Sequence, residues 1–283
     1  MGEKKRSLLE IHLAVLLFGL AGIFGKLILL PSPIIVLGRV FFSSLFLLLI
    51  MLVLKIELRL QRKQDYLYFI LLGIILAVHW TTFFQSIQVS TVAIGLLTFA
   101  TFPIFITFLE PYFFKEKILL SDIVLALVTF TGMVLVVDKP ELNNYLFQGV
   151  LWGLASSFTY AVLSMLNRKY VQDYSSSLIA FYEQSIATLV LIPFLFLYRP
   201  VFTVKDVLLI ALLGIVFTGI AHTLFIKGLK NVKTRTAGII SGLEPVYGIL
   251  FAMLIIKEIP TLRELIGGTV ILAAALHATL KVK

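Results

Sequence analysis

Apolar runs, each close to the length of a membrane span, alternate along the chain with short polar or proline-containing connections. A helix needs about 20 predominantly apolar residues to cross the hydrocarbon core of a bilayer. Because no long polar stretch separates the runs, the pattern predicts ten membrane-spanning segments and no soluble domain. The segments are about Leu8–Leu30, Ile34–Leu54, Tyr66–Ile87, Val92–Phe113, Leu119–Val137, Leu146–Met165, Leu178–Tyr198, Val207–Ile226, Thr236–Ile256 and Leu265–Leu280.

These segments are predicted to be helices. In hydrocarbon every backbone N–H and C=O group must find its partner inside the protein, which leaves helices and closed barrels as the spanning structures. The period-two alternation and regular turns of a membrane β-barrel do not occur in this sequence. We therefore expect an all-α membrane protein with ten transmembrane helices.

Two segments, Val92–Glu116 and Thr234–Glu258, share a layout in which a mid-segment proline is followed by a terminal Lys-Glu pair. The matched residues lie 142 positions apart and are Pro103, Lys115 and Glu116 in the first segment and Pro245, Lys257 and Glu258 in the second. The sequence therefore predicts two repeats, residues 1–140 and 141–283. With five helices in each, the second repeat enters the membrane upside down, and such inverted repeats are typical of secondary transporters.

The composition agrees with a protein embedded in lipid. Hydrophobic residues make up 60% of the chain and charged residues 14%, which is too little polar surface to cover a water-soluble globule. The chain has no cysteine, so disulfides, thiolate nucleophiles and zinc-thiolate sites are excluded. The net charge of +9 is spread over the short connections, so nucleic acid is not an expected partner.

Lys and Arg residues in the connections predict the orientation. The side that holds both termini carries 17 of them, and the opposite side carries 5. Because basic residues concentrate on the cytoplasmic side, we expect a multi-pass protein of the inner or plasma membrane with both termini in the cytoplasm. The basic N-terminus leads into the first apolar run without a small-residue cleavage site, so that run is predicted to be a retained span.

Pro103 and Pro245 lie inside apolar segments, and each is expected to kink its helix. A proline lacks the amide donor and frees the carbonyl four residues earlier, here on Phe99 and Ser241. The paired positions favour two bent helices around a central cavity. The alternative is a packing kink that neighbouring helices tolerate.

Glu244 is the leading candidate for chemistry. An ionised carboxylate near the centre of a helix costs on the order of 3 kcal/mol on insertion scales, so such residues usually face the bundle interior or a water-filled path. A buried carboxyl can also carry protons. The alternative is a permanently protonated carboxyl bonded to a neighbouring helix. The counterpart of Glu244 in the first repeat is Phe102, so its role is not duplicated.

His79 and His222 are the next candidates, because imidazole titrates near neutral pH. His79 and Trp80 are followed by two threonines and Gln85, which makes that helix face unusually polar. For each histidine the alternative is a fully hydrogen-bonded structural role. The four histidines of the chain show no metal-binding spacing, so no metal is expected.

Arg39 and Glu183 are charges within the second spans of the two repeats. Intramembrane charges commonly mark substrate contacts or gating pairs. Because inverted repeats place the two residues toward opposite faces, a direct ion pair between them is not expected. The alternative for Arg39 is a side chain that snorkels to the interface.

Trp152 and Tyr160, like Trp80, lie on spans that also carry small or polar residues. Such amphipathic aromatic side chains suit a cavity for aromatic or cationic solutes. Packing between helices is the alternative for each of the three.

Enzyme and pump signatures are absent, because the sequence has no glycine-rich nucleotide loop, no GxSxG and no Walker motif. We therefore expect no enzyme activity, no catalytic residue and no cofactor. A passive channel and an intramembrane enzyme are the other classes considered. A channel would need a continuous polar stripe along the spans, and an enzyme would need a paired catalytic constellation.

Taken together, the chain resembles the EamA family of the drug/metabolite transporter superfamily. The runs AIGLLTFATFP…FKE and AGIISGLEP…IKE and the opening GVLWGLASSFTY of the second repeat carry the resemblance, which covers about Leu8–Leu280. It implies ten helices, cytoplasmic termini and a central cavity lined by spans 1–4 and 6–9. Family members move amino acids, aromatic metabolites, nucleobases, vitamins or drugs, many of them outward. Phe102 departs from the carboxylate-proline pattern that Glu244 keeps.

We predict a secondary active transporter, specifically an exporter, of small organic metabolites such as amino acids, working by alternating access around a mid-membrane site. The predicted substrate-binding residues are His79, Trp80, Gln85, Trp152, Tyr160, His222 and Glu244. Protons are a candidate coupling ion, carried by Glu244 and the histidines. The alternative is a passive channel or a facilitator without proton coupling. Besides its substrate and the lipid bilayer no partner is predicted, and both a monomer and a homodimer fit the sequence.

Overall fold

The computed structural model describes residues 3–114, 120–136, 141–232 and 234–280, which form helices joined by short turns. No strand occurs among them, as expected for an all-α fold. The helices are α1 (Glu3–Leu27), α2 (Ser32–Val53), α3 (Lys63–Val89), α4 (Val92–Phe99), α5 (Phe102–Phe114), α6 (Leu120–Val136), α7 (Tyr145–Tyr170), α8 (Ser176–Leu191), α9 (Pro193–Tyr198), α10 (Val204–Gly214), the π-helical η1 (Ile215–Ile220), α11 (Ala221–Gly228), α12 (Thr234–Ser241), α13 (Glu244–Ile255) and α14 (Leu262–Leu280).

Seven helical stretches among the described residues are long and apolar enough to cross a membrane. They are Glu3–Leu27, Ser32–Val53, Lys63–Val89, Val92–Leu109, Tyr145–Tyr170, Ser176–Tyr198 and Val204–Gly228. Large apolar side chains such as Leu67 and Leu208 lie exposed on the outside of the bundle, where lipid would cover them. The Lys115–Glu116 pair and the ends of the predicted segment Leu119–Val137 lie outside the described residues.

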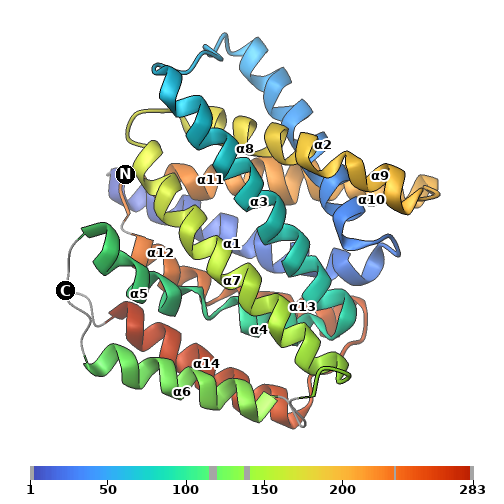
Figure 1. Cartoon of the computed structure of the whole chain (residues 1–283), viewed down its shortest axis with the longest axis vertical. Coiled ribbons are helices and arrows are strands. Elements are labelled where there is room, and N and C mark those ends of the chain that lie inside the picture. The colour runs from blue at the N-terminus through green and yellow to red at the C-terminus, as the bar shows by residue number, and fades with distance from the viewer. Residues whose placement is uncertain (1–2, 115–119, 137–140, 233, 281–283) are drawn as a thin grey trace.

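The helices pack into one bundle in which α1 runs through the middle (Figure 1). Helix α3 packs along α7, and α1 packs against α11 and α13. Helix α2 lies against α8, and α6 and α14 form a pair at one edge of the bundle (Figure 1). The start of α1 and the end of α14 lie on the same side of the molecule. Residues from both halves of the chain therefore meet at the centre.

Two of the predicted spans are broken into half-helices. Helix α4 is followed by α5 after a two-residue interruption, and α12 is followed by α13 in the same way. Pro103 and Pro245 are the second residues of α5 and α13, where a missing amide hydrogen leaves no intrahelical bond unmade. Helix α5 starts at Phe102 and α13 starts at Glu244, so the two helix starts are 142 residues apart, as the two prolines are. Each proline thus stands at a full interruption of its helix, which is more than the predicted kink.

A third irregularity lies in the stretch Val204–Gly228, where the π-helical η1 joins α10 to α11. Within η1 the Thr218 hydroxyl donates to the carbonyl of Leu213, five residues earlier, at 2.8 Å. This bond leaves the lone pairs of the Thr218 oxygen free to accept from another helix. Single π-helical turns occur frequently at functional sites.

Two glycines allow the close helix contacts that shape the centre. A β-carbon on Gly19 of α1 would lie 2.9 Å from the carbonyl oxygen of Glu244, and one on Gly214 of α10 would lie 2.6 Å from that of Arg39. A β-carbon essentially never approaches an oxygen so closely, so only glycine fits at either position. The backbones that carry Glu244 and Arg39 are therefore held directly against neighbouring helices.

Candidate functional site

A cavity lies in the middle of the bundle, where side chains from seven helices meet. Its volume is about 30 Å³, enough for one or two water molecules and too small for a metabolite. The lining residues are Phe18 and Ala21 of α1, Arg39 of α2, His79, Trp80 and Phe83 of α3, Phe99 of α4, Tyr160 of α7, His222 of α11 and Glu244 of α13. The cavity therefore combines a guanidinium, a carboxyl group, two imidazoles and an aromatic wall.

Arg39 is held in place by a hydrogen bond and by two rings. Its Nε donates to Thr218 Oγ1 of η1 at 2.8 Å. The guanidinium carbon lies 4.0 Å from the ring centroid of Trp80 and 5.2 Å from that of Phe84, in cation–π geometry. With 2% of its surface exposed, Arg39 points into the bundle and does not snorkel to the interface.

Glu244 faces the same cavity from another direction. It is the first residue of α13, where the partial positive charge of the helix start favours a carboxylate. The charges of Arg39 and Glu244 act on each other, yet the two form no direct salt bridge among the described contacts. A guanidinium and a carboxyl group thus stand apart across the cavity, each available to a ligand.

The two histidines have different partners. His79 Nδ1 lies 3.0 Å from the carbonyl oxygen of Ser156 and 2.9 Å from its Oγ. His222 Nε2 lies 2.7 Å from Glu183 Oε2, so the predicted intramembrane charge Glu183 is paired with a histidine. Glu183 itself is fully buried and does not line the cavity.

Aromatic rings form one wall of the cavity. The Tyr160 ring lies 5.0 Å from those of His79 and Phe99 and 4.9 Å from that of Phe102, measured between centroids. The Trp80 ring lies 5.4 Å from that of His222, so this indole touches both Arg39 and His222. Phe102, which lies 142 positions before Glu244, is buried and packs behind this wall, with its ring against those of Phe99 and Tyr160.

The structure brings five of the seven predicted substrate-binding residues together around the cavity, and it leaves Gln85 and Trp152 away from it. Gln85 accepts a hydrogen bond from the Ser32 hydroxyl at 2.7 Å between α2 and α3. Trp152 lies 42% exposed on α7. The five residues at the cavity are His79, Trp80, Tyr160, His222 and Glu244.

Sequence reasoning missed Thr218 and Phe99, which hold Arg39 and complete the aromatic wall. Phe99 was singled out only for its carbonyl, and one Phe among 24 in the chain carries no signal of its own. Thr218 lies in an apolar run, IVFTGI, and its π-helical turn leaves no recognisable mark in the sequence.

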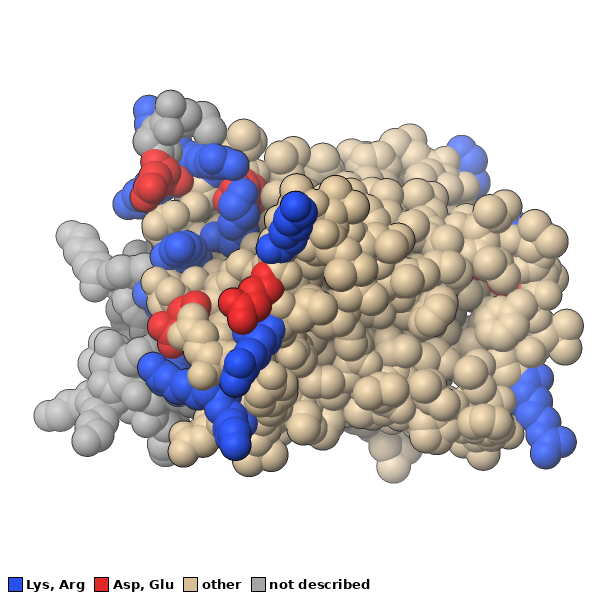
Figure 2. Space-filling view, turned by 90° about the horizontal axis from the view of Figure 1, so that it is seen from above, with Lys and Arg blue, Asp and Glu red and all other residues tan. Residues whose placement is uncertain are grey.

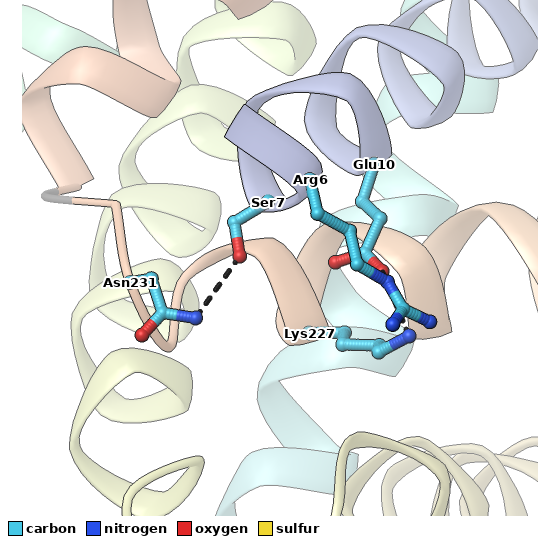
Figure 3. A network of polar contacts seen from close by, with 5 residues as sticks. All are labelled: Arg6, Ser7, Glu10, Lys227 and Asn231. Atoms are coloured by element: carbon cyan, nitrogen blue, oxygen red, sulfur yellow. Dashed lines mark hydrogen bonds and ion pairs between the residues drawn. The ribbon is translucent and has the colours of Figure 1, made fainter. Parts of the chain in front are cut away.

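Charged side chains gather at one end of the molecule and are nearly absent from the lateral surface visible in Figure 2. At this end Glu10 of α1 accepts from Arg6 Nε at 3.2 Å and from Lys227 Nζ of α11 at 2.7 Å. Asn231 Nδ2 donates to Ser7 Oγ at 3.1 Å (Figure 3). These contacts fasten α1 to α11 and to the turn that follows it.

A second contact closes the same end between α3 and the α7–α8 connection. The Tyr174 hydroxyl donates to the Asp65 carboxylate and accepts from the amide of Gln61 at 3.0 Å. Burial, together with the bond to Asp65, raises the pKa of Tyr174 above its ordinary value. The phenol therefore remains a donor throughout the neutral pH range.

The opposite end of the bundle has its own contacts. Lys26 at the end of α1 donates to the carbonyl of Ser90 at 2.6 Å, and Glu258 accepts from the amide of Val92 at 2.7 Å. Burial raises the pKa of Glu258, while the Val92 amide and the charge of Lys26 act in the opposite direction. Along α1 the cavity residues Phe18 and Ala21 lie between the two sets of contacts, so helix contacts are present on both sides of the cavity.

An all-helical bundle with membrane-length apolar helices and a small central cavity that charged and aromatic side chains line is an arrangement found in membrane transporters. The sequence profile of the EamA-like transporter family matches residues 6–138 and again residues 147–280. The chain therefore belongs to the EamA-like transporter family. Membership establishes a membrane protein that acts on small molecules.

Comparisons with individual proteins agree with this family assignment. The chain is 24% identical over 276 residues to the uncharacterized transporter YxxF of Bacillus subtilis, covering 96% of this chain and 88% of that protein. It is 26% identical over 207 residues to a protein of Rickettsia bellii named S-adenosylmethionine uptake transporter, covering 73% and 70%. A solved structure titled "Crystal structure of protein" superimposes with a TM-score of 0.71 over 99% of both chains at 18% identity, which shows a shared fold.

Proposed function

We propose that this protein is a secondary transporter of small zwitterionic metabolites, such as amino acids with apolar side chains, which bind in the central cavity. The observation that carries the proposal is the separation of Arg39 and Glu244 across one closed space. A carboxylate of the substrate pairs with the guanidinium, and an ammonium group pairs with the Glu244 carboxylate. The aromatic wall receives the apolar part.

The binding residues in this proposal are Arg39, His79, Trp80, Tyr160, His222 and Glu244, all at the cavity. Arg39 is already held by Thr218 and Trp80, so little side-chain order is lost when a substrate binds. His79 is tied to Ser156, and its ring stacks toward Tyr160, so it shapes the wall. The predicted sites at Gln85 and Trp152 receive no support from this geometry.

Alternating access is the mode of transport that we propose. Ligand sites of metabolites and drugs usually measure on the order of 300–1,000 Å³, so the cavity of about 30 Å³ is a closed state. Contacts fasten the helices on both sides of it, and in this proposal a substrate reaches it only when one set opens. A channel would leave one continuous path, which supports a carrier over the passive channel considered from the sequence.

The architecture that we propose for this motion is a pair of inverted repeats, residues 1–140 and 141–283, with ten spans. Support comes from the two matched family segments and from the helix interruptions that recur after 142 residues. The packing is also symmetric, because α3 packs on α7 as α11 packs on α1, and the equivalent helices α6 and α14 pair with each other. Half-helices at a repeat interface commonly form transporter binding sites.

We place both termini on the cytoplasmic side of the inner or plasma membrane. The support is the gathering of basic residues at the end of the bundle where α1 begins (Figure 2). Export remains our proposed direction, and the relatives named as uptake transporters show that the family name alone does not decide it. Reconstituted vesicles of known orientation measure the direction.

Substrate exchange in proteoliposomes tests the proposal. Vesicles loaded with unlabelled L-phenylalanine should accumulate labelled L-phenylalanine from outside, and the Glu244→Gln variant should lose this exchange because the ammonium group has no carboxylate partner. Glu57→Gln is the matched control, since Glu57 is an exposed carboxylate outside the helices, and it should exchange like the unmodified protein. Exchange by Glu244→Gln at the unmodified rate would contradict the proposed site.

A further inference from the structure

Glu183 of α8 and His222 of α11 form a buried pair beside the cavity, with Nε2 and Oε2 2.7 Å apart. The side chains are 0% and 3% exposed. His222 lines the cavity, whereas Glu183 lies behind it. His222 can therefore contact a ligand or water in the cavity, whereas Glu183 is buried between the helices.

The pair has two charge states. A carboxylate is an acceptor only, so an ionised Glu183 requires a hydrogen on His222 Nε2, and the pair then carries one negative charge. A second proton on the ring makes the pair neutral as a whole. An uncompensated charge within a membrane protein is costly, so the energy of the surrounding bundle differs between the two states. Uptake or loss of a single proton thus switches the charge buried between α8 and α11.

The surroundings do not fix the pair in one state. Among the described residues Glu183 Oε1 has no hydrogen-bond partner, and neither amide atom of the adjacent Gln184 has one. The charged and titratable groups around the pair are Arg39 of α2, His79 of α3, Tyr160 of α7 and Glu244 of α13, with Glu10 of α1 bound to Lys227 further along α11. None of these forms a salt bridge with Glu183.

The pair is also linked to the proposed substrate site. The Trp80 ring contacts His222 on one side and the Arg39 guanidinium on the other. A change of charge on the pair therefore acts on Arg39 over a short path that excludes bulk water, where charges interact strongly. Glu244, the carboxylate favoured by the sequence as proton carrier, instead faces Arg39 and the space that the substrate would fill.

We propose that the Glu183–His222 pair, and not Glu244, binds and releases the proton that drives transport. The His222 ring takes this proton from water in the cavity when one end is open and returns it to water when the other end is open. Only the N–H bond forms and breaks. The inference rests on the proposed transport function, and it assigns the coupling ion to residues distinct from those that hold the substrate charges.

Comparison of two transport modes tests the pair. In proteoliposomes labelled L-phenylalanine should accumulate when a pH gradient is imposed. Glu183→Gln should lose this accumulation because, without the carboxylate, a proton on the His222 ring leaves an uncompensated positive charge in the bundle. Exchange of internal for external L-phenylalanine needs no net proton movement, so Glu183→Gln should retain it. Glu183→Asp keeps a carboxyl group and should recover the response to the gradient. Glu57→Gln, which alters an exposed carboxylate outside the helices, should keep both modes.

A measurement without substrate keeps the test informative if a variant folds poorly. Infrared spectra of protein with isotopically labelled histidine should show a ring band that titrates in the unmodified protein and shifts its midpoint in Glu183→Asp. A gradient response retained by Glu183→Gln, or histidine bands that do not respond to Glu183→Asp, would overturn the proton site. Absence of exchange by the unmodified protein would instead contradict the proposed function. The infrared measurement would then still test the proton site, because it needs no substrate.

Discussion

Arg39 shows how a costly residue is kept within the bundle. A guanidinium cannot shed its charge in a protein, so its burial must be offset by direct partners. Thr218 accepts from Nε, Trp80 covers one face, and no further hydrogen bond of this side chain occurs among the described contacts. The terminal amino groups therefore remain for a ligand. Arg39 therefore fits a binding site in which the guanidinium completes its hydrogen bonds only when a ligand is bound.

The role assigned to Trp80 predicts a graded loss of affinity. Trp80→Leu removes the ring that orients Arg39, and a desolvated cation–π contact contributes about 1–2 kcal/mol. Binding of L-phenylalanine, measured by calorimetry or by thermal shift, should weaken by about 5- to 30-fold in consequence. Phe41→Leu alters an exposed ring on the neighbouring α2 and should leave binding unchanged. Equal losses in both variants would indicate a general packing defect.

At the residue scale, the sequence predicts which side chains belong to the site more readily than which partners they contact. Glu244, His79 and His222 stand out because charged or titratable side chains are rare in apolar spans. Their partners do not stand out, because Ser156 and Thr218 resemble the many hydroxyl residues that simply bond their own helix. Trp152 looked like Trp80 in composition, and only the rotation of α7 places it on the outside.

At the scale of elements, the half-helices explain how Glu244 reaches the cavity. The break before α13 ends one helix at Ser241 and starts another at Glu244, so the carboxylate lies at a helix start in the middle of the bundle. The proline signal predicted an irregularity at this point, and the 142-residue spacing predicted a second one. The full interruption could not be predicted, since a proline in a membrane helix is equally compatible with a gentle kink.

The α1–α13 contact predicts a difference between two neighbouring glycines. Gly19→Ala would place a methyl group 2.9 Å from the Glu244 carbonyl oxygen, whereas the nearest atoms to a methyl group at Gly22 are side-chain carbons 3.6 Å away. Overpacking costs about 1–3 kcal/mol, and it should lower the Tm of Gly19→Ala in detergent below that of Gly22→Ala. Both changes raise helix propensity equally, so this effect cancels. The same Tm in both variants would contradict the close contact.

At the scale of the whole molecule, polar contacts fasten the helices on both sides of a cavity too small for its proposed substrate. Glu10 and Lys227 fasten one end, and Lys26 and Glu258 lie at the other. The all-helical class followed from apolar run lengths alone, as did the seven membrane-length helical stretches among the described residues. The contacts that fasten the two ends did not, because they join residues such as Asn231 and Ser7, which are 224 positions apart in sequence.

Accessibility of the cavity from both sides tests alternating access most directly. The chain has no cysteine, so Ala21→Cys places one thiol on the cavity wall without further changes. A membrane-impermeant thiol reagent should modify this cysteine both in right-side-out and in inside-out vesicles, and L-phenylalanine should slow the modification from either side. Modification from one side only, or no protection by L-phenylalanine, would contradict a substrate cavity that opens alternately to the two sides.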